Sequence, residues 1–219
     1  FSLPPKIAES LPMAVTENIL MHFPDKSPNA KRYGSPEPKS IETVIKTVEN
    51  YIKNKNTEMV RIAQQTIIES YQNDMGKYNK QSEIPKTKIV YKNISTQLAK
   101  ENKKFQYKNI KSGGRAAEFE NAIEWLCLAG VASQLYRIEQ IALPLNAYRS
   151  LSDFKFYMND VGLCGAIQNI HFDDIERDNP LLYNFKGGLT ENYVFNQFTS
   201  NRFDLYYCFV WDYCRYRRF

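Results

Sequence analysis

The sequence predicts a mainly helical α+β protein, and three observations lead to this class. Apolar residues recur at helical spacing in several segments from residue 40 onward, which is the pattern of amphipathic helices. Two later segments, 133–143 and 153–160, have strand-like patterns instead. The chain of 219 residues is 43% hydrophobic and 14% aromatic, so it can bury a core and is not expected to be disordered.

The first 39 residues form an irregular, proline-rich segment. They contain seven of the ten prolines, and the run FPDKSPNAKRYGSPEP is typical of a surface loop. The chain begins with Phe1, which indicates a processed chain or a fragment.

Residues 40–150 are expected to form a helical and winged-helix region. Its first three helices each carry one apolar stripe: one begins after Ser40, one is capped by Thr57 and ends at about Tyr78, and one runs from about Lys86 to near Asn102. After the short segment FQYKNI, a break at Gly113-Gly114 precedes a helix that begins near Arg115 and stops at Gly130. Helix, short segment, longer helix and β-ribbon follow one another in the order of a winged helix-turn-helix.

The last third of the chain mixes both kinds of element. A helix is expected over LTENYVFNQF, opened by Thr190 after Gly187-Gly188, and a strand is expected over RFDLYYCFVW. The four cysteines form no C-x-x-C pair, and Cys127 lies in an apolar helical pattern that suits a buried free thiol. Without a signal peptide or a long apolar run, the chain is expected to be cytoplasmic, with no membrane contact.

Positive charge is concentrated between Lys80 and Arg115. This block holds nine lysines and one arginine against two glutamates, whereas the whole chain has a net charge of only +5. Two interpretations are open: a surface for a polyanionic partner, or a lysine-rich solvated face. Phe105 and Tyr107, inside the block, either stack on bases or pack between helices, and packing is the favoured alternative.

Catalytic and metal motifs are weak in this sequence. A phosphate-binding loop of the form G-x-x-x-x-G-K-[S/T] is absent, and the segment 111–115 before a helix is better explained as a flexible turn than as a phosphate cradle. His171 lies close to Asp173 and Asp174, but no other His or Cys has matching spacing, so no metal is assigned. No set of nucleophile, base and orienting residue is evident.

Six segments in fixed order carry a family resemblance: IIESYQNDMGKY, STQLAKENKKFQY, GGRAAEFENAIEWLCLAGV, LPLNAY, FKFYMNDVGL and GGLTENYVFNQF. They resemble the conserved C-terminal region of unknown function that follows the AAA-type ATPase module in many prokaryotic ATP-binding proteins. SLPMAVTENI is similar to the Gly-Gly-Met-Pro segment of that family, with Ser10 and Leu11 in place of the glycines. The resemblance spans about Leu11 to Tyr207.

The resemblance implies an ATPase module, then a winged helix, then a domain similar to the PD-(D/E)xK nuclease fold. The Walker motifs are missing here, so ATP and magnesium would belong to an absent N-terminal module, and no cofactor is assigned to this chain. Residues 151–219 would be an incomplete restriction-endonuclease-like α/β domain in which Glu191 is a lone remnant of the acidic set. One glutamate does not suffice for a metal-dependent phosphodiesterase, and Asp153-Phe154-Lys155 fits an aromatic strand of the family instead. The chain itself is therefore not expected to be an enzyme.

The sequence thus predicts a DNA-binding or regulatory module, with duplex DNA or the ATPase module as partner. The alternative is a protein-docking segment that uses the basic face against an acidic surface, and a nuclease is a remote third. The candidate phosphate contacts are Lys100, Lys103, Lys104, Lys108, Lys111 and Arg115.

The tail CFVWDYCRYRRF departs from the family pattern after Leu205–Tyr207. One hypothesis is a frameshift near codon 207, because a shifted reading of permitted codons yields an apolar-acidic strand. The protein would then be a truncated remnant with an exposed strand edge around residues 203–210.

Overall fold

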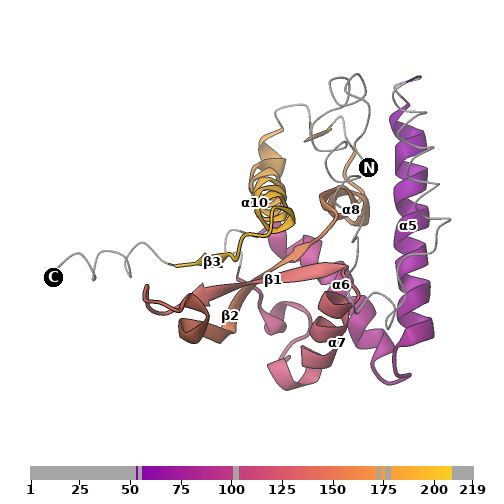
Figure 1. Cartoon of the computed structure of the whole chain (residues 1–219). Helices are drawn as coiled ribbons and strands as arrows, with labels where there is room; N and C mark the ends of the chain where they lie inside the picture. Colours follow the sequence, from indigo (N-terminus) through magenta and orange to yellow (C-terminus); the bar gives the residue numbers. More distant parts are fainter. Residues whose placement is uncertain (1–52, 54–55, 101–103, 172–173, 176–178, 209–219) are drawn as a thin grey trace.

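The computed structural model describes residues 53, 56–100, 104–171, 174–175 and 179–208 (Figure 1). The expected proline-rich segment and the helix after Ser40 lie outside these residues. Within them the chain is mixed α+β, with helices around a three-stranded sheet. Short 3-10 helices complete the connections: η1 (Tyr107–Asn109), η2 (Leu145–Tyr148) and η3 (Pro180–Leu182).

Helices α5 (Thr57–Tyr78) and α6 (Ile84–Leu98) are joined by a short turn. The cap of α5 is Asn56 and not Thr57, because the Asn56 Oδ1 accepts from the amides of Glu58 and Met59 at 3.0 and 3.2 Å. Helix α6 starts slightly earlier than expected, with a proline in its first turn, where a missing amide costs nothing. It ends at Leu98 and not near Asn102.

Helix α7 (Ala116–Leu128) has the expected boundaries at both ends. Gly113 has a φ of +73°, and a Cβ on Gly114 would lie 2.7 Å from the Tyr107 carbonyl oxygen, so the glycine pair is needed at this break. At the other end, Gly130 has a φ of +70°, and the Val131 amide donates to the Leu126 carbonyl at 3.0 Å. This is the Schellman motif, and it confirms the predicted stop.

The sheet has the strand order β2-β1-β3. Strands β1 (Ala132–Ile138) and β2 (Arg149–Met158) form the expected antiparallel hairpin, in which Ala132 lies opposite Met158. Strand β3 (Tyr206–Tyr207) pairs in parallel with Tyr136 and Arg137. The strand expected over 202–211 is limited to these two residues within the described part, and residues from 209 onward lie outside it. Strand β2 crosses residue 150, where a domain boundary was expected.

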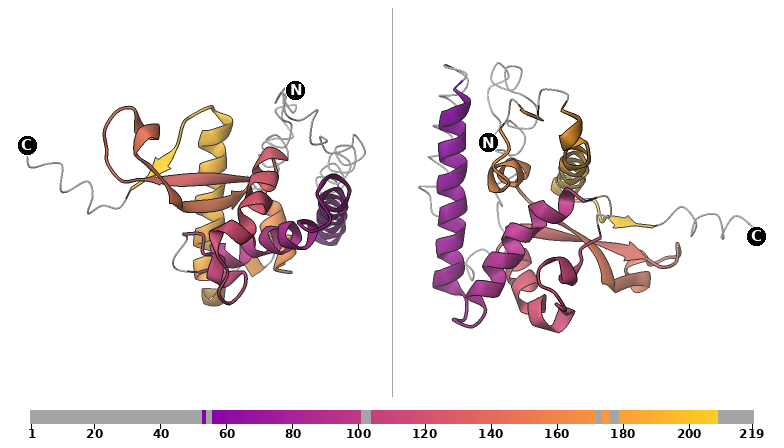
Figure 2. Two further views of the ribbon diagram at one scale, coloured as in Figure 1. Left: turned by 90° about the horizontal axis from the view of Figure 1, so that it is seen from below. Right: turned by 180° about the vertical axis from the view of Figure 1, so that it is seen from behind.

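The two faces of the sheet contact different elements. Phe154 and Phe156 point to the side of α6 and α7, where the Phe105 ring stacks on Phe154 with 5.5 Å between centroids. Figures 1 and 2 show α10 (Tyr183–Ser200) on the opposite side of the sheet from α7. Buried residues from α5, α6, α7, the sheet, α8 (Val161–Ile167) and α10 belong to one hydrophobic cluster.

Helix α10 (Tyr183–Ser200) begins well before the expected Thr190 and runs through both glycines. A Cβ on Gly188 would lie 2.3 Å from the carbonyl oxygen of Leu98, so α10 and the end of α6 approach closely at this point. Gly188 therefore serves helix packing and does not mark a helix start. None of the described helices is long and apolar enough to cross a membrane.

Candidate nucleic-acid interface

One face of α6 is cationic and exposed. Lys88 and Lys92 are one helical turn apart and therefore share a side of the helix, with Lys92 exposed and Lys88 half-buried. The exposed Lys100 follows just after the helix, which ends at Leu98. Val90 and Ile94 on the other side are fully buried in the core. Helix α6 contains no acidic residue. The apolar stripe thus fixes the helix against the core and leaves the lysine face toward solvent.

The segment around η1 is held alongside α6 by side-chain hydrogen bonds. The Asn93 Nδ2 donates to the Asn109 carbonyl at 3.3 Å. The Gln97 side chain accepts from the Gln106 amide at 2.8 Å and donates to the Gln106 carbonyl at 3.2 Å. These bonds hold η1, which carries the exposed Lys108, against α6. We use the name α6–η1 surface for five cations: Lys88 and Lys92 of α6, Lys100 just after it, Lys108 of η1, and Arg115 at the N-cap of α7.

The structure separates the candidate phosphate contacts into two groups. Lys100, Lys108 and Arg115 are exposed, and no carboxylate of the described residues pairs with them. Lys111 pairs with the Glu118 Oε1 at 2.9 Å, and Lys104 is half-buried in an ion pair with Asp153. Lys103 lies outside the described residues.

Lys88 and Lys92 were not selected from the sequence, although they fall inside the basic block. The signal that identifies them is their four-residue spacing, which is out of phase with the buried Val90 and Ile94.

Phe105 and Tyr107 pack inside the protein, as the favoured interpretation had it. Phe105 is 4% exposed, and its ring contacts those of Phe154 and Phe156. Tyr107 is half-buried and stacks on Phe119 with 6.4 Å between centroids. Neither ring is placed to stack on a base.

Helix α7, which would be the recognition helix of a winged helix-turn-helix, has an acidic outer surface. Glu120 and Glu124 are exposed and Glu118 is half-buried, while the other face buries Phe119 and Ile123. These carboxylates would repel the phosphates that flank a DNA groove.

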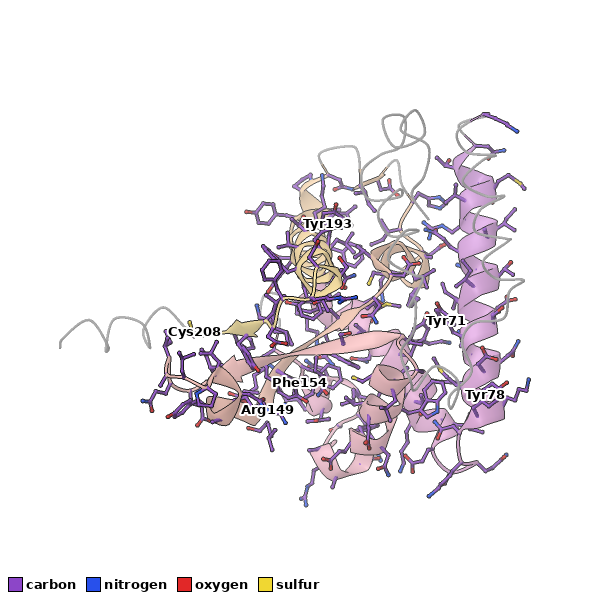
Figure 3. The ribbon with its side chains drawn as sticks, viewed as in Figure 1. Tyr71, Tyr78, Arg149, Phe154, Tyr193 and Cys208 are labelled. Carbon is purple, nitrogen blue, oxygen red and sulfur yellow. The ribbon has the colours of Figure 1, made fainter. Side chains whose placement is uncertain are left out.

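The loop of the β1–β2 hairpin, which would be the wing, is mostly apolar. Leu143 in the loop is 86% exposed, Leu151 near the start of β2 is 69% exposed, and residues 140–148 carry no charge. The nearest cation is Arg149, whose guanidinium lies over the Tyr136 ring at 5.1 Å and which Figure 3 shows at this end of the hairpin. The hairpin tip is therefore a surface for apolar contact.

Glu191 lies on α10 facing the sheet and is engaged by two residues of β2. Lys155 forms an ion pair with its Oε1, and the Tyr157 hydroxyl donates to the same oxygen at 2.7 Å. Burial raises the pKa of the Tyr157 hydroxyl, and the adjacent Glu191 charge raises it further, so this tyrosine is a proton donor at all ordinary pH values. The Lys155 ammonium also lies 5.0 Å from the centroid of the Tyr207 ring.

The second carboxylate of this face is also neutralised. Asp153 pairs with Lys104 and, at 3.2 Å, with Arg137. The fold thus brings Asp153, Lys155 and Glu191 to one face of the sheet, although the sequence placed the Asp153–Lys155 segment apart from Glu191. Each carboxylate faces cations and not another carboxylate. Across the described part of the chain, no three His, Cys, Asp or Glu residues cluster as metal ligands would.

Fold and surface together define a small α+β domain with one cationic helix face and one network of ion pairs on its sheet. Residues 46–174 match the protein family described as "Domain of unknown function (DUF8612)", and the chain belongs to this family. Helix α10 and strand β3 follow the matched residues. Neither curated proteins nor solved structures gave a match.

Proposed function

We propose that this chain is a non-catalytic module that binds the phosphate backbone of duplex DNA through the α6–η1 surface. The observation that carries the proposal is the set of cations on this surface without carboxylate partners among the described residues. An unpaired lysine can exchange its counterion for a phosphate without first breaking an internal ion pair. The surface has no base-stacking ring, so it would provide affinity without sequence readout.

The order α6, α7, β1 and β2 is that of a winged helix-turn-helix, but the charges favour an unusual mode of contact. Phosphates would meet α6 and η1, since Glu120 and Glu124 disfavour insertion of α7 into a groove. If all five cations of the α6–η1 surface contact phosphates, log K should fall with log salt concentration with a slope of about −4.5.

The test compares two double variants with equal charge loss. Lys92→Gln/Lys108→Gln removes two cations of the α6–η1 surface, and Lys53→Gln/Lys77→Gln removes two exposed lysines outside it. Binding to a fluorescein-labelled duplex is followed by anisotropy over a salt series. The first variant should lower the magnitude of the slope by about 1.8, and the second should leave it unchanged. Absence of binding by the parent chain, or equal loss in both variants, would refute the proposal. Lys104 is unsuitable as a test, because its loss would disturb Asp153.

Within a longer AAA-type ATP-binding protein, which the sequence resemblance implies, the module would bring DNA to an ATPase module that holds ATP and magnesium. A cytoplasmic location is part of this proposal. A complete PD-(D/E)xK-like site is disfavoured, because Asp153 and Glu191 are each neutralised by cations.

A second candidate function is protein docking, and the apolar hairpin tip favours it. A leucine that is 86% exposed at the end of a hairpin suits contact with the ATPase module or another protein. Leu143→Ser should then weaken the complex with that partner and leave DNA affinity unchanged. Co-elution of the variant and the parent with the ATPase module to the same extent would exclude this surface.

A further inference from the structure

Hydrogen bonds and an ion pair between polar side chains of α10 and residues at β2 attach this helix to the sheet. Asn192 is fully buried, and its amide group bonds both backbone polar atoms of Met158, accepting from the nitrogen at 3.1 Å and donating to the oxygen at 2.8 Å. Asn196, one turn later, donates to the Met158 and Asn159 carbonyls at 3.0 and 3.1 Å. Glu191 adds the ion pair with Lys155 and the bond from Tyr157.

The apolar part of this attachment joins α10 to the hydrophobic core. Phe185 and Phe195 belong to the core cluster, Leu189 packs against it, and the Phe195 ring lies 4.9 Å from the Tyr157 ring, centroid to centroid. Among its large apolar side chains, α10 buries Phe185 and Phe195, while Val194 and Phe198 remain about half exposed. Strand β3 adds pairing through two residues only. The ion pair and the hydrogen bonds of this interface can be replaced by bonds to water on separation, as in a transient protein contact.

The sheet face that α10 covers belongs to the matched family domain, whereas α10 and β3 lie outside that domain. Arg137, Asp153, Lys155 and Tyr157 all precede residue 174, whereas α10 and β3 follow it. Figure 1 shows α10 on the side of the sheet opposite α7, and β3 continues the sheet at its β1 edge. The family domain therefore presents a charged sheet face and an open strand edge to whatever segment follows it.

We propose that this face, together with the edge of β1, is a docking surface for a helix followed by a short extended segment, and that α10–β3 of this chain is its releasable occupant. The helix is recognised by consecutive carboxylate and amide residues, the positions of Glu191 and Asn192. The carboxylate forms an ion pair with Lys155 and accepts a hydrogen bond from Tyr157, and the amide side chain bonds the backbone of Met158 at the end of β2. The extended segment pairs in parallel with Tyr136 and Arg137 of β1.

Native-state hydrogen exchange on the full chain tests release without any substitution. Amides of α10 and β3 should exchange through an opening that leaves α6 and α7 protected. In Glu191→Gln this opening should increase about tenfold, since a charge-assisted bond is lost, while α6 and α7 keep their protection. The control is Glu120→Gln at an exposed position of α7, which should change neither the opening of α10 nor the protection of α6 and α7. Exchange of α10 together with α6 and α7 in one cooperative unit would overturn the proposal.

The docking surface is tested with a labelled peptide of residues 183–208. It should bind the Glu191→Gln chain more tightly than the parent, because the tethered occupant competes at high effective concentration. A peptide with the Gln substitution at its own glutamate should bind more weakly. Exchange of α10–β3 between two copies, seen as dimers, would support the same surface with a second copy as occupant. Release of α10–β3 without binding of the peptide or a second copy would overturn the docking assignment.

Discussion

Asn192→Leu should strongly destabilise the protein, although leucine has the same number of side-chain heavy atoms in the same branched arrangement. The Asn192 side chain is fully buried and satisfies the Met158 amide and carbonyl at 3.1 and 2.8 Å. A leucine would fill the space but remove both bonds, leaving the Met158 amide without its side-chain acceptor. Loss of an acceptor for a buried donor costs about 1–3 kcal/mol, and the second bond adds about 1 kcal/mol. The expected loss in the free energy of unfolding is therefore about 2–4 kcal/mol.

Asn196→Leu is the matched comparison. Asn196 donates to the Met158 and Asn159 carbonyls and, in these bonds, accepts nothing from the backbone. The Met158 carbonyl keeps its bond from Asn192 after this change, so the cost should be about 1 kcal/mol.

Urea unfolding followed by far-UV circular dichroism gives both free energies, with the slope of each transition checked for constancy. The argument is that the Asn192 side chain replaces a backbone hydrogen-bonding partner for Met158 at the end of β2. It is wrong if Asn192→Leu lowers the free energy of unfolding by less than Asn196→Leu does, or by less than about 1 kcal/mol.

Three further predictions concern helix ends, helix packing and a thiol. Arg202 follows α10 with a φ of +64°, so Arg202→Gly should raise the free energy of unfolding by about 0.5–1 kcal/mol in the same urea assay; a decrease would contradict the strain argument. Gly188→Ala should lower it by about 3 kcal/mol or more, because the new Cβ would meet the Leu98 backbone, and a neutral result would mean that α10 shifts freely. Burial raises the pKa of the Cys127 thiol from about 9 to about 12, so the folded state keeps a proton that the unfolded chain loses. Stability should fall as pH rises through that interval, and Cys127→Ala should reduce the fall; an equal pH dependence would exclude this thiol as a contributor.

The helices were predictable where one local signal decides them. The apolar stripe of α5, the break at Gly113-Gly114 and the stop at Gly130 each depend on residues close in sequence. The start of α10 was not predictable in this way. Gly188 looks like a helix breaker in the sequence, and its role becomes clear only when the Leu98 carbonyl is placed against it.

The basic surface was predictable as a region but not as a set of residues. The charge count locates the block, yet it does not distinguish Lys104, which pairs with Asp153, from Lys108, which remains exposed. Pairing across the sheet depends on strand register, and the register joins residues far apart in the chain. For the same reason Glu191 was assigned as an isolated remnant, whereas the fold gives it Lys155 and Tyr157 as partners.

The central position of β1 has a consequence for the order of folding. Its pairing with β2 closes a short loop, since Ile138 lies opposite Arg149, whereas its pairing with β3 joins Tyr136 to Tyr206. Each doubling of a loop adds about 0.6 kcal/mol of closure entropy, so the parallel pair has the larger entropic barrier and only two residues to offset it. On a ribosome, the hairpin is complete before Tyr206 has been synthesised. The nascent domain therefore has a period in which the β1 edge is open, and a strand from another chain can pair with it before its own β3 arrives.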